Sequence, residues 1–270
     1  MDIFVIVFIL AGLGSVVVSF ALEGGHLIAL FEPTALLTII GGTIGAIGLS
    51  FPMEELKRLP KIMGVMFKYK PVEYSKVVIQ LHSLAVEARK EGLLCLEKYA
   101  SDESDSVQEG IIKKGLSLIV DGVGTGDIRK SLENDIDHIS ERHESGIAIF
   151  EAMGGYLPTM GIIGTVLGLV HVLGNLEDSA TLGPKIAIAF IATLYGIGFA
   201  NILALPMAGR LKAINEKEYV KNQMIVEGLV SLQEGKNPNL MVEDMCSFLD
   251  FKEREKALRA LGEGEKSGGM

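Results

Sequence analysis

The sequence predicts an all-α membrane protein with four transmembrane helices, a helical cytoplasmic domain between the second and third helices, and a cytoplasmic C-terminal tail. Two observations favour this fold class. Four apolar segments lack acidic and basic side chains over about the thickness of a bilayer, and two long charged regions interrupt or follow them. Of the 270 residues, 49% are hydrophobic and 22% are charged, a composition between that of a soluble enzyme and that of a pure membrane bundle.

Each apolar segment is long enough to cross the hydrocarbon core as a helix. Lipid offers no partners to backbone N–H and C=O groups, which a helix pairs internally. The first segment lacks a basic flank and a clear cleavage site, so we interpret it as a retained helix and not as a signal peptide. The predicted spans are residues 3–22, 34–53, 152–176 and 186–209.

The distribution of Lys and Arg predicts the orientation. The short connections 23–33 and 175–184 contain neither residue, whereas all basic residues except Lys185 lie between Lys57 and Arg142 or between Arg210 and Lys266. The positive-inside rule therefore places both charged regions and both termini in the cytoplasm. The predicted domains are a transmembrane hairpin (1–53), a cytoplasmic helical domain (54–151), a second transmembrane hairpin (152–209) and a cytoplasmic helix with a flexible tail (210–270).

Two of the membrane helices are expected to continue beyond the bilayer. Between residues 127 and 152 no proline interrupts an amphipathic pattern that runs directly into the third span. The fourth span is expected to continue to about Leu232. The Gly, Glu, Lys and Ser residues from Gly262 onward are typical of a disordered tail.

Glycines recur at helical spacing in two of the spans and create smooth helix faces that another backbone can approach. Packing within one hairpin would explain them, and so would an interface between copies or a seat for a partner helix. These glycines are Gly161, Gly164 and Gly168 in the third span and Gly41, Gly45 and Gly48 in the second.

Two threonines lie on faces otherwise made of small residues. Thr165 shares the stripe of Gly161 and Gly168, and Thr193 shares a face with Gly196. A buried Thr most often bonds the carbonyl four residues earlier in its own helix, which is the favoured interpretation of either residue alone. Together the two hydroxyls could line a polar path.

No Asp or Glu lies inside any of the four spans. An ion path across hydrocarbon usually needs a carboxylate or His, because a desolvated ion is very costly. His171, near the outer end of the third span, is better explained as an interfacial side chain than as a proton carrier. If the protein conducts ions, the acid is expected to come from another chain.

Other function classes find little support. The net charge of −9 disfavours nucleic-acid binding, which needs a basic surface. The sequence contains no HExxH, GxSxG or P-loop motif, so we predict no enzyme active site, no metal and no cofactor.

Several motifs resemble those of the MotA/PomA stator subunits of the bacterial flagellar motor, within the MotA/TolQ/ExbB proton channel superfamily. The resemblance covers nearly the whole chain, and TolQ and ExbB have three spans where this chain has four. The most specific motifs are Leu157-Pro158-Thr159-Met160-Gly161 with Gly168-Leu169-Val170-His171, Ala189-Phe190-Ile191-Ala192-Thr193-Leu194-Tyr195-Gly196 followed by Pro206, and Glu87-Ala88-Arg89-Lys90-Glu91-Gly92 with Leu96-Glu97.

The resemblance implies a homopentamer in the bacterial inner membrane around the single-span helices of a MotB/PomB dimer, whose Asp supplies the missing carboxylate. It also implies that Pro158 and Pro206 serve gating and torque and that Thr193 lines the ion path. Arg89 and Glu97 match residues that meet the rotor protein FliG, although by themselves they would be ordinary surface charges.

The transported ion stays open between H⁺ and Na⁺. Thr165 stands where sodium-driven members of the family have Thr and many proton-driven members have Ala. Two alternatives to a stator also remain: an energiser of an outer-membrane system, as in the ExbB/TolQ branch, and a membrane scaffold without ion traffic.

Overall fold

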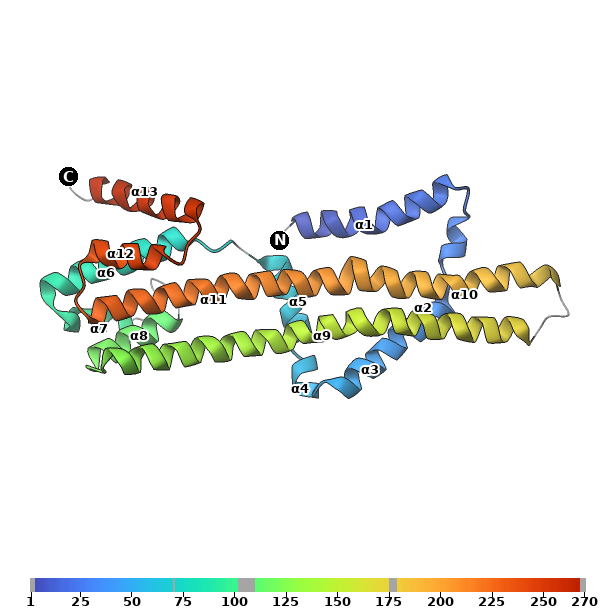
Figure 1. The fold of residues 1–270 in the computed structure, drawn as a ribbon, viewed down its shortest axis with the longest axis horizontal. Helices are drawn as coiled ribbons and strands as arrows, with labels where there is room; N and C mark the ends of the chain where they lie inside the picture. The colour runs from blue at the N-terminus through green and yellow to red at the C-terminus, as the bar shows by residue number, and fades with distance from the viewer. Residues whose placement is uncertain (1–2, 70, 102–109, 175–178, 268–270) are drawn as a thin grey trace. The chain divides into compact units, whose positions relative to one another are not determined.

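The computed structural model describes residues 3–69, 71–101, 110–174 and 179–267 (Figure 1). Every regular element within these ranges is a helix, which confirms the predicted all-α class. The elements are α1 (Ile3–Leu22), η1 (Leu27–Leu30), α2 (Pro33–Leu36), η2 (Leu37–Gly41), α3 (Gly42–Ser50), α4 (Met53–Leu56), α5 (Leu59–Lys68), α6 (Tyr74–Glu91), η3 (Leu93–Leu96), α7 (Glu97–Ser101), α8 (Gly110–Val120), α9 (Thr125–Leu173), α10 (Ser179–Phe199), η4 (Ala200–Ala204), α11 (Leu205–Gln233), α12 (Pro238–Cys246) and α13 (Phe251–Ser267).

Within the described ranges, four helical stretches are long and apolar enough to cross a membrane: Ile3–Leu22, Leu27–Ser50, Thr125–Leu173 and Leu182–Gln233. This agrees with the four predicted spans. The second stretch ends three residues earlier than predicted, because Phe51 is extended before Pro52, as residues preceding proline usually are. Residues 175 and 176 of the predicted third span lie outside the described ranges.

Both predicted extensions are confirmed. Helix α9 is continuous over 49 residues, from the amphipathic segment into the third span, and Pro158 lies inside it. Helix α11 runs to Gln233, one residue past the expected end. Helix α13 continues to Ser267, and the flexibility of the tail stays a prediction. Helix α13 is anchored to the core by buried Ala257 and half-buried Leu261.

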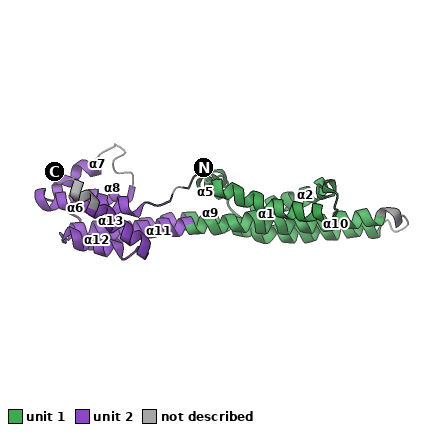
Figure 2. Cartoon of the chain, turned by 90° about the horizontal axis from the view of Figure 1, so that it is seen from above, with its two compact units in different colours: residues 1–70, 143–213 green, residues 71–142, 214–270 purple. Residues whose placement is uncertain are grey.

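The chain divides into two compact units, coloured separately in Figure 2. The first unit comprises Met1–Lys70 and His143–Ala213, and the second comprises Pro71–Arg142 and Ile214–Met270. Helix α5 belongs to the first unit, where its Met66 is buried with Ile147 and Phe150. The predicted limits at residues 53, 151 and 209 concern the edge of the lipid and stay predictions.

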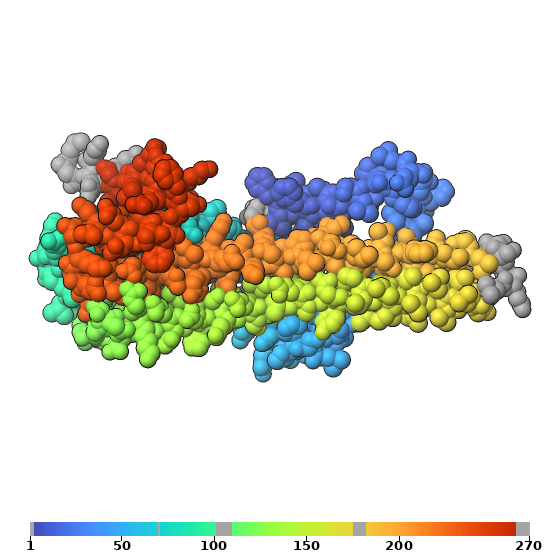
Figure 3. Space-filling view, viewed as in Figure 1, coloured from blue at the N-terminus to red at the C-terminus, as the bar shows by residue number. Residues whose placement is uncertain are grey.

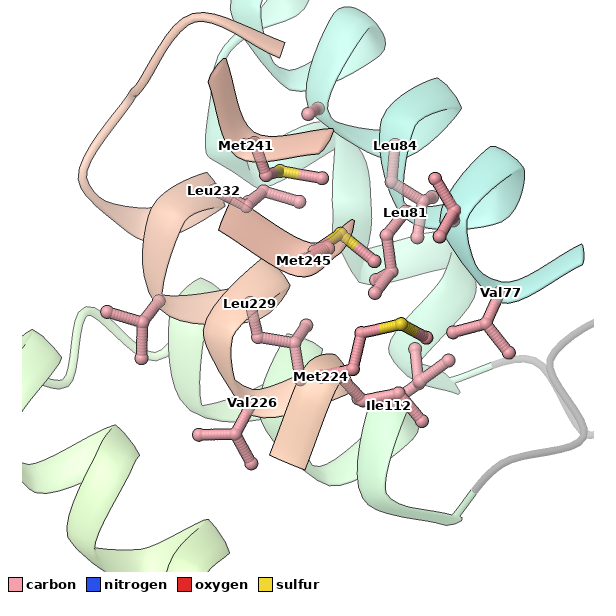
Figure 4. Packing of buried hydrophobic residues seen from close by; sticks show 14 of the residues in the cluster. Val77, Leu81, Leu84, Ile112, Met224, Val226, Leu229, Leu232, Met241 and Met245 are labelled. Atoms are coloured by element: carbon pink, nitrogen blue, oxygen red, sulfur yellow. The ribbon is translucent and has the colours of Figure 1, made fainter. Parts of the chain in front are cut away.

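The two units differ in where their apolar side chains lie. In the first, α1 has no buried residue, and its side chains form the dark blue surface in Figure 3. In the second, side chains from α6, α8, α9, α11 and α12 fill one apolar core (Figure 4). Its fully buried members include Leu81, Ile112, Leu116, Leu132 and Met224.

Candidate ion path and coupling sites

Helices α9 and α10 pack closely along the glycine stripe of the third span. A Cβ placed on Gly161 would lie 3.0 Å from the Ala192 carbonyl oxygen, and one on Gly168 would lie 2.7 Å from the Ala189 Cβ. Only glycine permits this approach without a shift of a neighbour. For this stripe, the interpretation as packing within one hairpin is confirmed.

The second span behaves differently. A Cβ on Gly41, Gly45 or Gly48 would meet no described atom within 4 Å, so packing within one copy does not explain that stripe. The described contact runs through Gly42, on which the Met160 side chain packs. A role of the exposed stripe in contacts between copies stays a prediction.

The close α9–α10 seam brings the two candidate path residues together. Thr165 and Thr193 are half-buried, and their hydroxyl groups share a short hydrogen bond. The Thr165 Oγ1 also lies 3.1 Å from the Gly161 carbonyl oxygen and 3.0 Å from the Ala189 carbonyl oxygen. The predicted bond of Thr165 within its own helix is therefore present, together with a second one across the seam.

The hydroxyl pair has more acceptors than donors. Each hydroxyl has one hydrogen, so Thr165 donates to one of its two carbonyls at a time and can accept from Thr193. Two hydroxyl and two carbonyl oxygens thus gather between apolar helices. Oxygen atoms of these kinds are ligands that hard cations accept, and a hydroxyl pair can also relay a hydrogen bond.

The two predicted coupling prolines are linked through one contact between α9 and α11. Pro158 has no N–H, so the Gly154 carbonyl lacks its usual helical donor. Gly154 is buried, and the side chain of Leu205, which directly precedes Pro206, packs against it. Each proline thus lies within one helical turn of the same packing point.

A π-helical turn, η4, precedes Pro206. At its end the Leu205 N–H donates to the Ala200 carbonyl, five residues earlier. Such π-helical turns are rare in proteins, and those that occur often lie at functional sites. Sequence reasoning missed η4 and the similar turn η2 in the second span. Pro206 is a partial signal, because it removes one helical donor, but it does not specify how the chain re-pairs.

Tyr195 has a role that the sequence pattern did not predict. Its hydroxyl accepts from the Glu32 N–H at 3.1 Å and donates to the Leu30 carbonyl. The Glu32 carboxylate in turn accepts from the Thr34 N–H and caps α2. Tyr195 therefore ties the connection between the first two spans to the fourth.

Arg89 and Glu97, the predicted rotor contacts, are both exposed in the second unit. Arg89 lies in the last turn of α6, and Glu97 begins α7. Gly92 connects them with a φ of 89°, a conformation that L side chains rarely adopt. The turn places the two charges on α6 and α7, on either side of η3.

A polar network holds this turn together. Glu87 accepts from the Lys98 ammonium and, at 2.8 Å, from the Tyr99 hydroxyl. The hydrogen bond from Lys98 and then that from Tyr99 lower the pKa of Glu87, and the same carboxylate raises the pKa of Lys98 and of Tyr99. Glu87 belongs to the motif of residues 87–92, and the motif did not predict this network. The spacing of 11 residues across a turn gave no signal.

Comparison with known proteins adds a family to this geometry. Residues 6–92 match the model of the motility protein A N-terminal region, and residues 103–224 match that of the MotA/TolQ/ExbB proton channel family. The chain is 35% identical over 240 residues to motility protein A of Bacillus subtilis, covering 88% of this chain and 87% of that protein. The chain belongs to the motility protein A branch of this family.

A second relative and a solved structure extend over most of the chain. Chemotaxis protein PomA of Vibrio alginolyticus is 31% identical over 254 residues, covering 94% of this chain and 98% of that protein. A chain of the flagellar MotAB stator complex from Bacillus subtilis superposes with a TM-score of 0.85 at 34% identity, covering 93% of this chain and 98% of that one. The expected family is thereby confirmed, and the chain is a membrane protein.

Proposed function

We propose that this chain is a stator subunit of a flagellar motor, which assembles in several copies with a MotB-type partner and couples ion flow to torque. The observation that supports it is the match to a MotAB stator chain over 93% of the residues at a TM-score of 0.85. The match of residues 6–92 to motility protein A covers most of the first two spans. That match favours a stator over an ExbB/TolQ-like energiser or a scaffold.

The proposal includes the finer assignments that the family implies. The subunit forms a pentamer in the inner membrane with both termini in the cytoplasm, and its cytoplasmic unit contacts FliG. It acts without catalytic residues or a cofactor. Since the four spans contain no Asp or Glu, the partner helix supplies the ion-binding carboxylate next to the Thr165–Thr193 pair.

Deletion of the gene in its source bacterium tests the function. The deletion strain should assemble flagella that do not turn under power, and induced re-expression should raise the speed of a tethered motor in discrete steps as units join it. Re-expression without any change in rotation would overturn the proposal. Purified chain in liposomes without its partner should pass no measurable H⁺ or Na⁺ current.

We propose Na⁺ as the transported ion, with H⁺ as the second candidate. The oxygen cluster at Thr165 supports Na⁺, which needs several oxygen ligands, whereas a proton needs only an acid and a hydrogen-bonded route. Motor speed should then fall in sodium-free medium and survive a protonophore while a sodium gradient persists. Thr165→Ala should reduce sodium-dependent speed and Thr165→Ser should retain it, since Ser keeps the hydroxyl. Unchanged ion dependence in Thr165→Ala would remove the sodium assignment.

The prolines are proposed to let α9 and α11 flex at the Gly154–Leu205 contact. One ion crossing about 150 mV releases roughly 3.5 kcal/mol, enough only for a nearly balanced rearrangement. Pro158→Ala and Pro206→Ala should therefore assemble with the partner yet rotate slowly. Full speed in both variants would contradict this role.

Arg89 and Glu97 are proposed to act on FliG through charge attraction, because both are exposed. Arg89→Glu should impair torque and stator recruitment, and reversal of the opposing charge on FliG should partly restore them. Exposed charges are screened over roughly 10 Å at 0.1 M salt, so the defect should be largest at low ionic strength. Unchanged torque in Arg89→Glu would refute the contact.

A further inference from the structure

A cavity of about 430 Å³ lies in the first unit, between α1, α5 and the segment that contains η4. Most of its lining is apolar and includes Phe8 and Ile9 from α1, Ile202 from η4 and Met207 from α11. A Cβ on Gly12 would lie 3.0 Å from the Ile202 side chain, so α1 and η4 touch at this point. A volume of this size accommodates a small or chain-like ligand.

The cavity has a polarity along its length. Val5 packs with the cluster that contains Ala208 and Leu211, so the start of α1 lies beside the Arg210 end of the cavity. Gly12 lies beside Ile202, toward the middle of the span. Arg210 is the first charged residue after the fourth apolar segment and lines the cavity. The site is therefore apolar toward the membrane interior and cationic toward the charged region.

We propose that this cavity binds one anionic phospholipid of the cytoplasmic leaflet, with an acyl chain along Phe8 and Ile202 and the phosphate at Arg210. The charge at the cytoplasmic end of the cavity favours this occupant. The positive-inside distribution places Arg210 at the cytoplasmic face. Helix α5 contributes Met66 to the lining, and its Lys61 and Lys68 lie outside the lining. Basic pockets between membrane helices on that side are suited to anionic headgroups.

The lipid would contact Pro206, which also lines the cavity. Its presence would restrain η4 and the start of α11, which line the cavity together with α1 and α5. The fourth span would thus respond to the lipid composition of the cytoplasmic leaflet through Pro206, separately from its part in the ion path.

The test uses the absence of Trp from the chain. Phe8→Trp places a fluorescent side chain in the cavity wall, and Phe4→Trp places a matched one on the same helix outside it, since both phenylalanines are 71% exposed. The complex with its partner is reconstituted in phosphatidylcholine vesicles that contain a minor fraction of dibrominated phosphatidylglycerol or dibrominated phosphatidylcholine. Emission of the complex without the introduced Trp is subtracted.

Brominated phosphatidylglycerol should quench Phe8→Trp with an apparent affinity about fivefold higher than brominated phosphatidylcholine, the equivalent of about 1 kcal/mol per basic side chain. Phe4→Trp should show no such preference. In the Phe8→Trp background, Arg210→Gln should abolish the preference, Arg210→Lys should keep it, and Lys212→Gln, which removes a nearby exposed charge outside the cavity, should leave it unchanged.

Two results would overturn the proposal. Equal quenching of Phe8→Trp by both brominated lipids would show a cavity open to bulk lipid without headgroup selection. Absence of quenching by either lipid would show that the site is filled by protein, such as a second copy of this chain. Correct assembly of each variant is checked beforehand by co-purification with the partner, so that a folding defect is not mistaken for a lost site.

Discussion

The first and second units of this chain use the same apolar residue types in opposite ways. In the second unit, Leu81, Ile112 and Leu132 are fully buried in one core. In the first, Phe8 and Leu37 are more than two thirds exposed, and α1 has no buried residue at all. Water drives the burial of apolar side chains, whereas lipid tails are as apolar as leucine and do not. The membrane helices consequently depend on glycine contacts and backbone pairing in addition to two small apolar clusters, around Leu157 and around Met66.

The largest expected effect contrasts two leucines of the two units. Leu81→Ala opens a cavity in the core and should cost about 2 to 5 kcal/mol, whereas Leu37→Ala, at a side chain that is 76% exposed, should cost far less. Hydrogen exchange of the α6 amides in the intact complex measures the difference. Leu81→Ala should accelerate exchange throughout α6, and equal protection in the two variants would contradict the assigned core.

The next contrast tests whether exposed side chains of the first unit face lipid and those of the second unit face water. Leu10 and Leu94 are 64% and 71% exposed, one in α1 and the other in η3. Leu10→Asp should make the free energy of membrane insertion about 3 kcal/mol less favourable, because a charge near the centre of a span is costly. The Leu94→Asp variant should insert into the membrane normally, because Leu94 faces water. The fraction of chain recovered in the membrane after alkaline extraction measures this. Similar recovery of both variants would show that α1 does not face lipid.

Sequence patterns predicted the elements of both units better than their contacts. The apolar repeat at Ile128, Leu132 and Ile136 predicted the continuous α9, and charge-free length predicted four spans, because both features are local. The own-helix bond of Thr165 to Gly161 is local as well and was expected. The bond to Ala189 depends on how α9 meets α10, and this register is set by packing.

The features that were missed depend on tertiary structure. The π turn η4 reflects how the backbone re-pairs around Pro206 under α1, which no short-range pattern describes. The Glu87–Lys98–Tyr99 network crosses a turn fixed by Gly92. Helix α13 continues to Ser267 although the composition from Gly262 onward is typical of disorder, and its Ala257 and Leu261 pack on the core.

A smaller effect is expected at the membrane seam. Gly168→Ala would place a Cβ 2.7 Å from the Ala189 Cβ and 3.1 Å from its Cα, so the α9 and α10 backbones must separate. Overpacking of this kind costs about 1 to 3 kcal/mol and should weaken the Thr165–Thr193 contact. Gly14→Ala, on α1, meets no described atom within 4 Å and serves as the matched control. A lower Tm of the detergent-purified complex in Gly168→Ala alone is expected, and equal Tm values would contradict the close seam.

The smallest expected effect is a pH dependence in the second unit, which arises at Glu87 because its carboxylate accepts from Lys98 and Tyr99. The hydrogen bonds from Lys98 and Tyr99 lower the pKa of Glu87 below its unfolded value, so the native state favours the ionised carboxylate. The stability that this carboxylate contributes is present above the unfolded pKa, about 4.3, and is lost as the pH falls through the lower folded pKa. Because the Lys98 side chain is largely exposed, the contribution should stay below about 1 kcal/mol.

Glu87→Gln should therefore lower Tm slightly near neutral pH, and the deficit should shrink as the solution is acidified. A deficit of Glu87→Gln that stays constant from neutral to acidic pH would mean that the network acts through shape and not through the charge of Glu87.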